Sequence, residues 1–378
     1  MKISPHHSTL NTQSPETSTF PPVSSLPNPL ELLNLYFSQG TSGTNKASWL
    51  WRKMDELLSW ENLLERGYQA DMCPLLYYII TKEMPLWPNS TFSPRNLPSI
   101  VPDSIITKLR NNYLLSLKRN IILLDELKII TKTINKEGIA VVTLKGGYLA
   151  EHIYEDIACR PMGDLDILVS SKDRKKAYKI IKQLGFQECA ETEHERSMHI
   201  SFMKTQLNVQ IICEIHHKLV KDIFPIDFDS DTIMHNGILT PEQQIVYYSW
   251  HMIRHGVHRC MWLCDVAHLL SRSSTNIDTN ELQRYSKKSN TESYLFCTIG
   301  LLSETVLSTK LFSKKITNSF SIRYFFNQLF FRIQKSILNN NTNIKKRYIL
   351  SLLPMKSSFL AQITINFLKR KLFSNNVT

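Results

Sequence analysis

The sequence predicts an α+β protein in which a small mixed β-sheet lies between an N-terminal and a C-terminal helical lobe. Apolar residues recur with the period of a helix up to about residue 134, and from Gly138 they alternate with the period of a strand. After Thr240 and Pro241 the helical period returns. No stretch reaches the roughly 18 uncharged apolar residues of a membrane span, so we expect no membrane contact.

The first two segments are a polar tail and a helical lobe. Residues 1–29 contain 16 Ser, Pro or Thr and too little apolar surface to offset chain entropy, so we predict that they are disordered. Residues 30–137 form the predicted N-terminal helical lobe, because apolar residues recur there at helical spacing. Within this lobe, residues 85–102 form a Pro-rich connector, and Asp103 is the predicted N-cap of the second long helix.

Residues 138–235 form the predicted sheet domain. Gly146 and Gly147 are expected to end its first strand, and Gly185 is expected to end a basic amphipathic helix. The expected elements are, in order, a strand at 139–144, a short helix at 148–154, a strand at 164–169, a helix at 173–184, and antiparallel hairpin strands at 198–203 and 209–215 around a turn at 205–208.

Two further helical segments complete the chain. Residues 236–310 form the predicted C-terminal helical lobe, and residues 311–378 form a basic helical module. The helices expected in the lobe lie at 243–253, 261–271 and 292–307.

The net charge of +12 is confined to the end of the chain. Residues 301–378 hold 13 Lys or Arg and a single acid, Glu304, whereas the first 300 residues are formally neutral. This basic module either binds RNA through its phosphates or forms the solvated side of a helical subdomain. Binding that weakens steeply as salt rises would favour RNA.

The cysteines indicate a reducing compartment. There are seven, an odd number, without a CxxC pair, which argues against a disulfide framework or a zinc ribbon. Proline residues interrupt every apolar run near the N-terminus that would serve as a secretory signal. We therefore expect a cytoplasmic protein.

Two acids are placed side by side at the start of a predicted strand. Because side chains alternate along a strand, Asp164 and Asp166 project from one face, and Leu165 and Ile167 from the other. A divalent ion with oxygen ligands, Mg²⁺, would relieve the repulsion between the acids. The alternative is a pair of acids on the solvated face of an edge strand.

The two glycines before this strand also have two interpretations. Gly146 and Gly147 lie at a strand-to-helix junction, where missing side chains let backbone N–H groups approach a phosphate. The alternative is a tight turn without a ligand.

These motifs resemble a known superfamily. The segments LKGGYLAEHIY, RPMGDLDILV and EIHHKL are similar to those of the polymerase-β-like nucleotidyltransferase superfamily, and more closely to bacterial nucleotidyltransferase family proteins. The resemblance extends from about Trp49 to Leu270. It implies transfer of a nucleoside monophosphate from a nucleoside triphosphate, such as ATP, to a hydroxyl acceptor that is a small molecule, a peptide or protein, or tRNA. The alternative is a catalytically degenerate protein that binds nucleotides or nucleic acid.

The resemblance also implies a set of site residues. Asp164, Asp166 and Glu214 would hold two Mg²⁺ ions, with Mn²⁺ as a substitute, although the family more often has Asp where this chain has Glu214. For Glu214 the alternative is a solvent-facing acid on an exposed hairpin. The candidate nucleotide-binding residues are Gly146, Gly147, Lys145 and Arg160.

The histidines allow a separate metal hypothesis. His251 and His255 lie four residues apart on one helix face and His258 follows, so a zinc site is one interpretation. The other interpretation is that His251 and His255 line the wall of the nucleotide cleft. His216 and His217 either border Glu214 in the site or occupy a partly exposed strand end.

Overall fold

The computed structural model describes residues 60–83, 101–190, 198–220, 226–228, 230–255, 259–272 and 277–305. The polar tail at 1–29 and the basic module at 311–378 lie outside the described residues. Their disorder and RNA binding therefore stay predictions, as do the domain boundaries.

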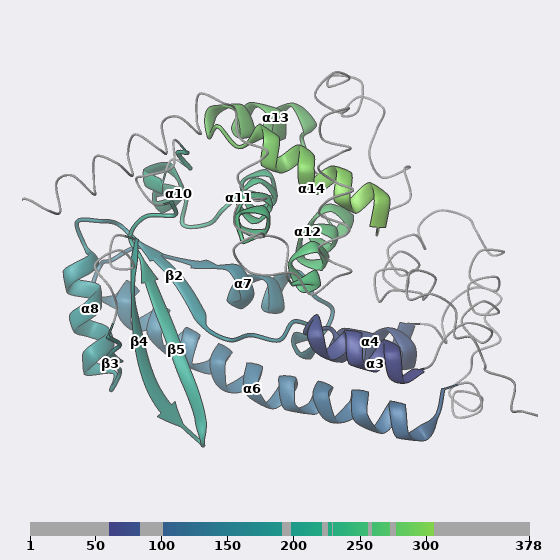
Figure 1. Cartoon of the computed structure of the whole chain (residues 1–378). Helices are drawn as coiled ribbons and strands as arrows, with labels where there is room; N and C mark the ends of the chain where they lie inside the picture. Colours follow the sequence, from purple (N-terminus) through teal and green to yellow (C-terminus); the bar gives the residue numbers. More distant parts are fainter. Residues whose placement is uncertain are drawn as a thin grey trace, which may run out of the picture.

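A five-stranded mixed sheet forms the centre of the described structure (Figure 1). Its strand order is β1-β2-β5-β4-β3. The β2 and β5 strands pair in parallel, and the other neighbours pair antiparallel. The strands are β1 (Val141–Leu144), β2 (Leu165–Val169), β3 (Gln187–Glu188), β4 (His199–Gln206) and β5 (Val209–His216). The sheet and its surrounding helices confirm the predicted α+β class.

One face of the sheet packs against α6 (Asp103–Lys136) and α8 (Arg174–Gln183). Leu127 and Ile130 of α6 share a hydrophobic core with Leu165 and Ile167 of β2. Each such side chain contributes roughly 1.5–3 kcal/mol when it is fully buried. The side chains of Leu165 and Ile167 therefore face this core, as the predicted alternation along the strand requires.

The opposite face is covered in part by helices of the C-terminal half, whereas the helices at 60–83 lie beside α6 (Figure 1). Val142, Leu144 and Leu168 of the sheet join the core of these helices. None of the helices in the described segments combines the length and the apolar character that crossing a bilayer requires. The helices at 60–83 are α3 (Trp60–Gln69), α4 (Cys73–Tyr78) and η2 (Ile79–Glu83), and those of the C-terminal half are α10 (Ser230–Asn236), α11 (Pro241–Arg254), α12 (Cys260–Arg272), α13 (Thr279–Lys288) and α14 (Glu292–Thr305).

Several boundaries differ from the prediction. The N-cap of α6 is Pro102, and Asp103 is its first residue, where the carboxylate still faces the positive end of the helix dipole. The helix predicted at 148–154 begins earlier than expected, as α7 (Lys145–His152). Gly146 and Gly147 therefore lie in its first turn and do not precede it. The short elements β3, α10 and α13 were not predicted, since few residues define their periodicity.

The hairpin between β4 and β5 has a tighter turn than predicted. Leu207 and Asn208 both have positive φ values, 51° and 61°, which are typical of a two-residue type I′ turn. Both strands are consequently longer than expected, and His199 pairs with His216. The turn therefore sets which side chains of the hairpin lie opposite one another.

The predicted start of the C-terminal helices is confirmed. Thr240 caps α11 by accepting a hydrogen bond from the backbone N–H of Gln243, and the Gln243 side chain accepts from the backbone N–H of Thr240. Pro241 follows at the first helical position, where its missing N–H costs nothing. This capping box explains why the helical period resumes at that point.

Candidate functional site

Asp166 and Glu214 lie side by side on two interior strands. The parallel pairing of β2 and β5 sets Asp166 opposite Glu214, so both side chains point to the face that the C-terminal helices partly cover. The Asp166 side chain is 2% exposed and that of Glu214 is 22% exposed. Because β2 and β5 are both interior strands, the edge-strand alternative for Asp166 and the exposed-hairpin alternative for Glu214 are wrong.

The Asp166 carboxylate already has two cationic or polar partners. Lys145 Nζ donates to Asp166 Oδ1 at 2.7 Å, and His216 Nε2 lies 2.8 Å from the same oxygen. Burial opposes ionisation of Asp166, but Lys145 and His216 outweigh it and hold the pKa of Asp166 below its ordinary value. Asp166 is therefore ionised at neutral pH.

Asp164 directly precedes β2, and its pKa is shifted in the opposite direction to that of Asp166. The negative charge of Asp166, followed by burial, raises the pKa of Asp164 to about 6. The charge of Glu214 adds to this effect. Both neighbouring acids thus disfavour the ionised form of Asp164, and Lys145 opposes them only in part.

Lys145 occupies an unusual backbone conformation at the end of β1. Its φ of 46° lies in the left-handed region, which is uncommon and costly for a residue with a side chain. Its carbonyl oxygen accepts a hydrogen bond of 3.4 Å from the hydroxyl of Tyr248, a residue of α11. The predicted triphosphate contact of Lys145 stays a prediction, because its ammonium contacts Asp166 in this structure.

Gly146 and Gly147 form the first turn of α7 directly beside the acids, since Leu144 of β1 pairs with Asp166. The first N–H groups of a helix have no partner within the helix, so they are available to an anion. Gly147 also has a packing role. A Cβ at this position would lie 2.9 Å from Leu127 Cδ2.

We predict that Gly147→Ala lowers stability by about 1–3 kcal/mol, the typical cost of an added methyl in a tight core. The new Cβ would also lie 3.1 Å from Thr143 Cγ2, so two neighbours must shift. Thermal unfolding followed by circular dichroism measures the effect. Gly163→Ala is the matched control, because a Cβ there has nothing within 4 Å. Equal melting temperatures for the two variants would contradict the packing role.

Arg160 is engaged in a buried ion pair, and its charge also opposes the rise in the pKa of Asp164. Its Nε and Nη2 donate to the two carboxylate oxygens of Asp265 at 2.7 and 2.9 Å, and its Nη1 donates to the carbonyl of Pro161. The Tyr154 hydroxyl also donates to Asp265. This buried pair joins the loop before β2 to α12. The predicted triphosphate contact of Arg160 is untested, and it would have to compete with Asp265.

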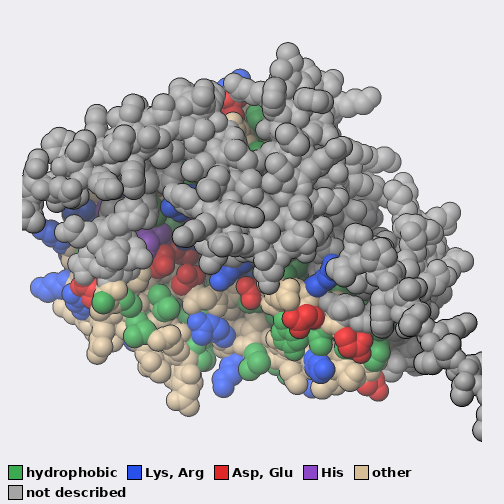
Figure 2. All heavy atoms as spheres, viewed as in Figure 1, with side chains coloured by type: hydrophobic (Ala, Val, Ile, Leu, Met, Phe, Trp, Pro, Cys, Tyr) green, Lys and Arg blue, Asp and Glu red, His purple; other side chains and the backbone are tan. Residues whose placement is uncertain are grey.

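Two histidines lie beside Glu214. His216 Nε2 is 3.3 Å and His199 Nε2 is 3.8 Å from Glu214 Oε2. His216 thus borders Glu214, which is one of the two interpretations of the sequence. His199 was missed, although the predicted hairpin strands also place it on the same face as Glu214. In the space-filling view, acidic side chains lie directly beside a histidine, with basic side chains close by (Figure 2).

The histidines of α11 contact aromatic rings. The rings of His251 and His255 lie 4.6 Å apart, and His251 meets the edge of Trp262 at 5.0 Å. Burial lowers the pKa of His251 well below its ordinary value. His258 lies outside the described residues. Within the described ranges, His251 and His255 are not joined by a third potential metal ligand.

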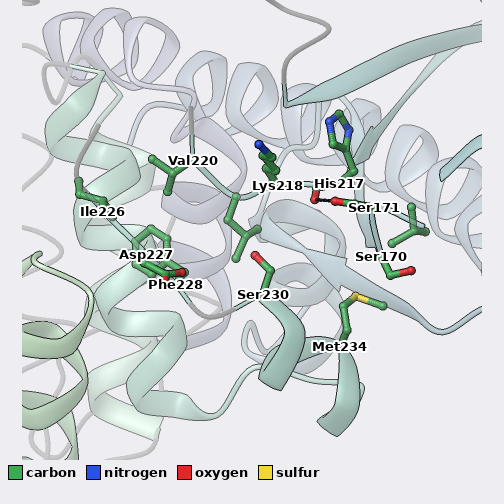
Figure 3. A pocket seen from close by; sticks show the side chains of 12 residues that line it. Ser170, Ser171, His217, Lys218, Val220, Ile226, Asp227, Phe228, Ser230 and Met234 are labelled. Atoms are coloured by element: carbon green, nitrogen blue, oxygen red, sulfur yellow. Dashed lines mark hydrogen bonds between the residues drawn. The ribbon is translucent and has the colours of Figure 1, made fainter. Parts of the chain in front are cut away.

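A cavity of about 300 Å³ lies where β2 and β5 end, next to α10 (Figure 3). His217 lines it, and the Ser171 hydroxyl donates to the His217 carbonyl at 3.1 Å (Figure 3). Burial, and then the charge of Arg174, lower the pKa of His217 to about 4. None of the three acids lines this cavity. His217 therefore belongs to a different surface from Glu214.

The chain matches the family model described as an uncharacterised nucleotidyltransferase over residues 56–306, about two thirds of its length. The chain belongs to this family. The matched range contains every strand and all the site residues named above. Comparison with curated proteins and with solved structures gave no significant match. Bacterial origin and membership of the polymerase-β-like superfamily stay predictions.

Proposed function

We propose that this member of the nucleotidyltransferase family transfers a nucleoside monophosphate from a nucleoside triphosphate to a hydroxyl acceptor, in a reaction that requires a divalent metal. The observation that carries the proposal is the pairing of Asp166 with Glu214 on neighbouring parallel strands. Because their backbones are fixed by the sheet, the two carboxylates meet without a further conformational change.

The donor set fits Mg²⁺. Asp164, Asp166 and Glu214 supply only carboxylate oxygens, the ligands that hard divalent cations prefer. Asp166 holds the ammonium of Lys145 at 2.7 Å, so its carboxylate already has a positively charged partner in this structure. Two bound Mg²⁺ ions, or Mn²⁺ in their place, would neutralise the triphosphate and stabilise the leaving pyrophosphate.

The residues of the chain have distinct expected roles. Asp166 is held ionised and is ready to bind a metal at neutral pH. Glu214, which is more exposed than Asp166, is expected to accept the proton of the acceptor hydroxyl as well as to bind metal. Lys145 is expected to leave Asp166 for a phosphate oxygen when nucleotide binds. The first N–H groups of α7, at Gly146 and Gly147, are expected to bind the triphosphate.

Incubation with each of the four nucleoside triphosphates, labelled at the α-phosphate, tests the proposal. Purified full-length protein, Mg²⁺ and cell lysate are combined, and small molecules, proteins and RNA are separated and examined for label. We expect one class of acceptor to become labelled, and the label to disappear when EDTA removes the metal. The Asp166→Asn variant serves as the inactive control.

The outcome also tests the alternative function. A protein that binds a nucleoside triphosphate but labels no acceptor, with any of the four nucleotides, would favour a catalytically degenerate binding protein. Labelled tRNA would instead link the transfer to the basic residues at 301–378.

A further inference from the structure

The strongest feature outside the three acids is the convergence of two histidines on Glu214. His216 Nε2 lies 3.3 Å and His199 Nε2 lies 3.8 Å from Glu214 Oε2. One ligand atom from each of the three residues lies within 4.8 Å of the others. In the segments that the structure describes, no other group of three potential metal ligands is this close.

The distances bring the three groups close enough to share one ion. In a tetrahedral site with metal–ligand bonds of about 2.1 Å, neighbouring ligand atoms lie about 3.4 Å apart. The distance of 3.3 Å between His216 and Glu214 is close to this value, and the distance of 3.8 Å between His199 and Glu214 is slightly longer. In this structure His216 also forms a hydrogen bond with Glu214, which an ion would replace.

The sheet holds the three ligands in place. His199 of β4 pairs with His216 of β5, and Ser201 pairs with Glu214. Glu214 and His216 are two residues apart on one strand, so they share a face. The side chains of His199, Glu214 and His216 are 16%, 22% and 3% exposed, so the site is sheltered yet open on the Glu214 side.

We propose that His199, Glu214 and His216 bind a divalent transition-metal ion of the Mn²⁺ or Zn²⁺ type through Nε2, Oε2 and Nε2. Imidazole nitrogen favours such ions, whereas Mg²⁺ prefers oxygen. Asp166 Oδ1, 2.8 Å from His216 Nε2, is close enough to serve as a fourth ligand. On binding, the ion replaces the proton on His216 Nε2, which is released to solvent.

The site extends the proposed function, because the ion at Glu214 would be a transition metal, whereas the ion at Asp164 would be Mg²⁺. The role of this ion in transfer rests on the proposed function, whereas its binding does not. The ion would lie on the Glu214 side of the acids, where an acceptor hydroxyl would approach.

Metal binding by the full-length protein, without nucleotide, tests the inference. The protein is stripped with a chelator and titrated with Zn²⁺ and separately with Mn²⁺, and bound metal is measured by equilibrium dialysis and elemental analysis. We expect one ion per chain, retained in a large excess of Mg²⁺. His199→Ala is expected to lower the affinity at least about tenfold.

Two further variants test whether a loss of metal affinity is specific to the proposed ligands. His152→Ala removes an exposed histidine, 54% accessible, and is expected to leave the affinity unchanged. His216→Ala is expected to lose the ion as well, but this side chain is buried, so its folding is first checked by thermal unfolding. Because His199 is partly exposed, His199→Ala remains a test even where His216→Ala does not fold.

Three outcomes would overturn the inference: no bound ion, unchanged affinity in His199→Ala, or displacement of Zn²⁺ by an equal concentration of Mg²⁺. Transfer assays on the same preparations keep the two proposals apart. Transfer with Mg²⁺ by a protein that binds neither Zn²⁺ nor Mn²⁺ at this site in dialysis would reject the site and retain the proposed function. Binding of the ion without transfer to any acceptor would do the reverse.

Discussion

Replacing either acid of the Asp164–Asp166 pair with its amide is expected to abolish nucleotidyl transfer while changing stability in opposite directions. Asp164→Asn and Asp166→Asn each remove a ligand charge with almost no change in volume. The transfer rate is therefore expected to fall by orders of magnitude in both variants. The assay is the labelled transfer described above, and stability is measured by thermal unfolding in EDTA.

Asp166→Asn is expected to lower stability because it leaves the Lys145 ammonium without its carboxylate. Breaking a buried ion pair costs about 3–5 kcal/mol, and we expect the lower end of this range, since the Lys145 side chain is 18% exposed and can reach water. The pKa of Asp166 is lowered in the folded protein, so its stabilising charge is present above about pH 4. The difference in melting temperature is expected to shrink as the pH falls below that value.

Asp164→Asn is expected to raise the melting temperature by a few degrees above pH 6. Mainly because of Asp166, folding raises the pKa of Asp164 from 3.8 to about 6. The ionised Asp164 therefore destabilises the fold, fully above pH 6 and not at all below about pH 4. The two melting curves should converge as the pH falls through this window.

Asp125→Asn is the control for both variants, because Asp125 is an exposed acid of α6. It is expected to change neither transfer nor stability. Turnover within a few-fold of the parent in Asp166→Asn would reject the assignment of this acid. A lower melting temperature for Asp164→Asn at pH 8 would show that repulsion between the acids does not govern the site.

Asp265→Asn is expected to destabilise the protein strongly, although Asp265 lies outside the three acids. Its carboxylate accepts two hydrogen bonds from Arg160 and one from Tyr154, and its side chain is 3% exposed. The amide would leave the buried guanidinium without a counter-ion, at a cost of about 3–5 kcal/mol. Chemical denaturation at neutral pH measures the loss.

An exposed pair of the same geometry provides the control. Glu281 accepts two hydrogen bonds from Arg284 on the surface of α13, where the Arg284 side chain is 70% exposed. Because solvent screens this pair, Glu281→Gln is expected to leave stability almost unchanged. Losses of equal size in the two variants would contradict a structural role for the Arg160–Asp265 pair.

The long, strongly periodic elements were predictable from the sequence, and their boundaries were less so. The strand that carries Asp166, the helix that ends before Gly185, and the start of a helix after Thr240 all match the structure, because a local pattern encodes each of them. The short helix at 279–288 was missed, although Asp278 caps it by accepting from two backbone N–H groups.

The hairpin shows how a small error in a turn changes a site. A turn at 205–208 would pair Lys204 with Val209, whereas the observed two-residue turn pairs Lys204 with Ile211. The shift of two residues keeps every side chain on its predicted face but changes its partner. The place of His199 opposite His216 thus followed from the turn conformation and not from the alternation.

The sequence by itself determined that Asp166 lies on a strand whose Leu165 and Ile167 face the core, and that a strand-to-helix junction at Gly146 and Gly147 precedes it, since strand and helix periodicities are local properties. Only the tertiary structure decided which groups meet this acid. Glu214 reaches Asp166 through parallel pairing of two distant strands, and Arg160 is paired with Asp265, 105 residues away. Such contacts depend on how separate elements pack, which the spacing of residues within one element does not encode.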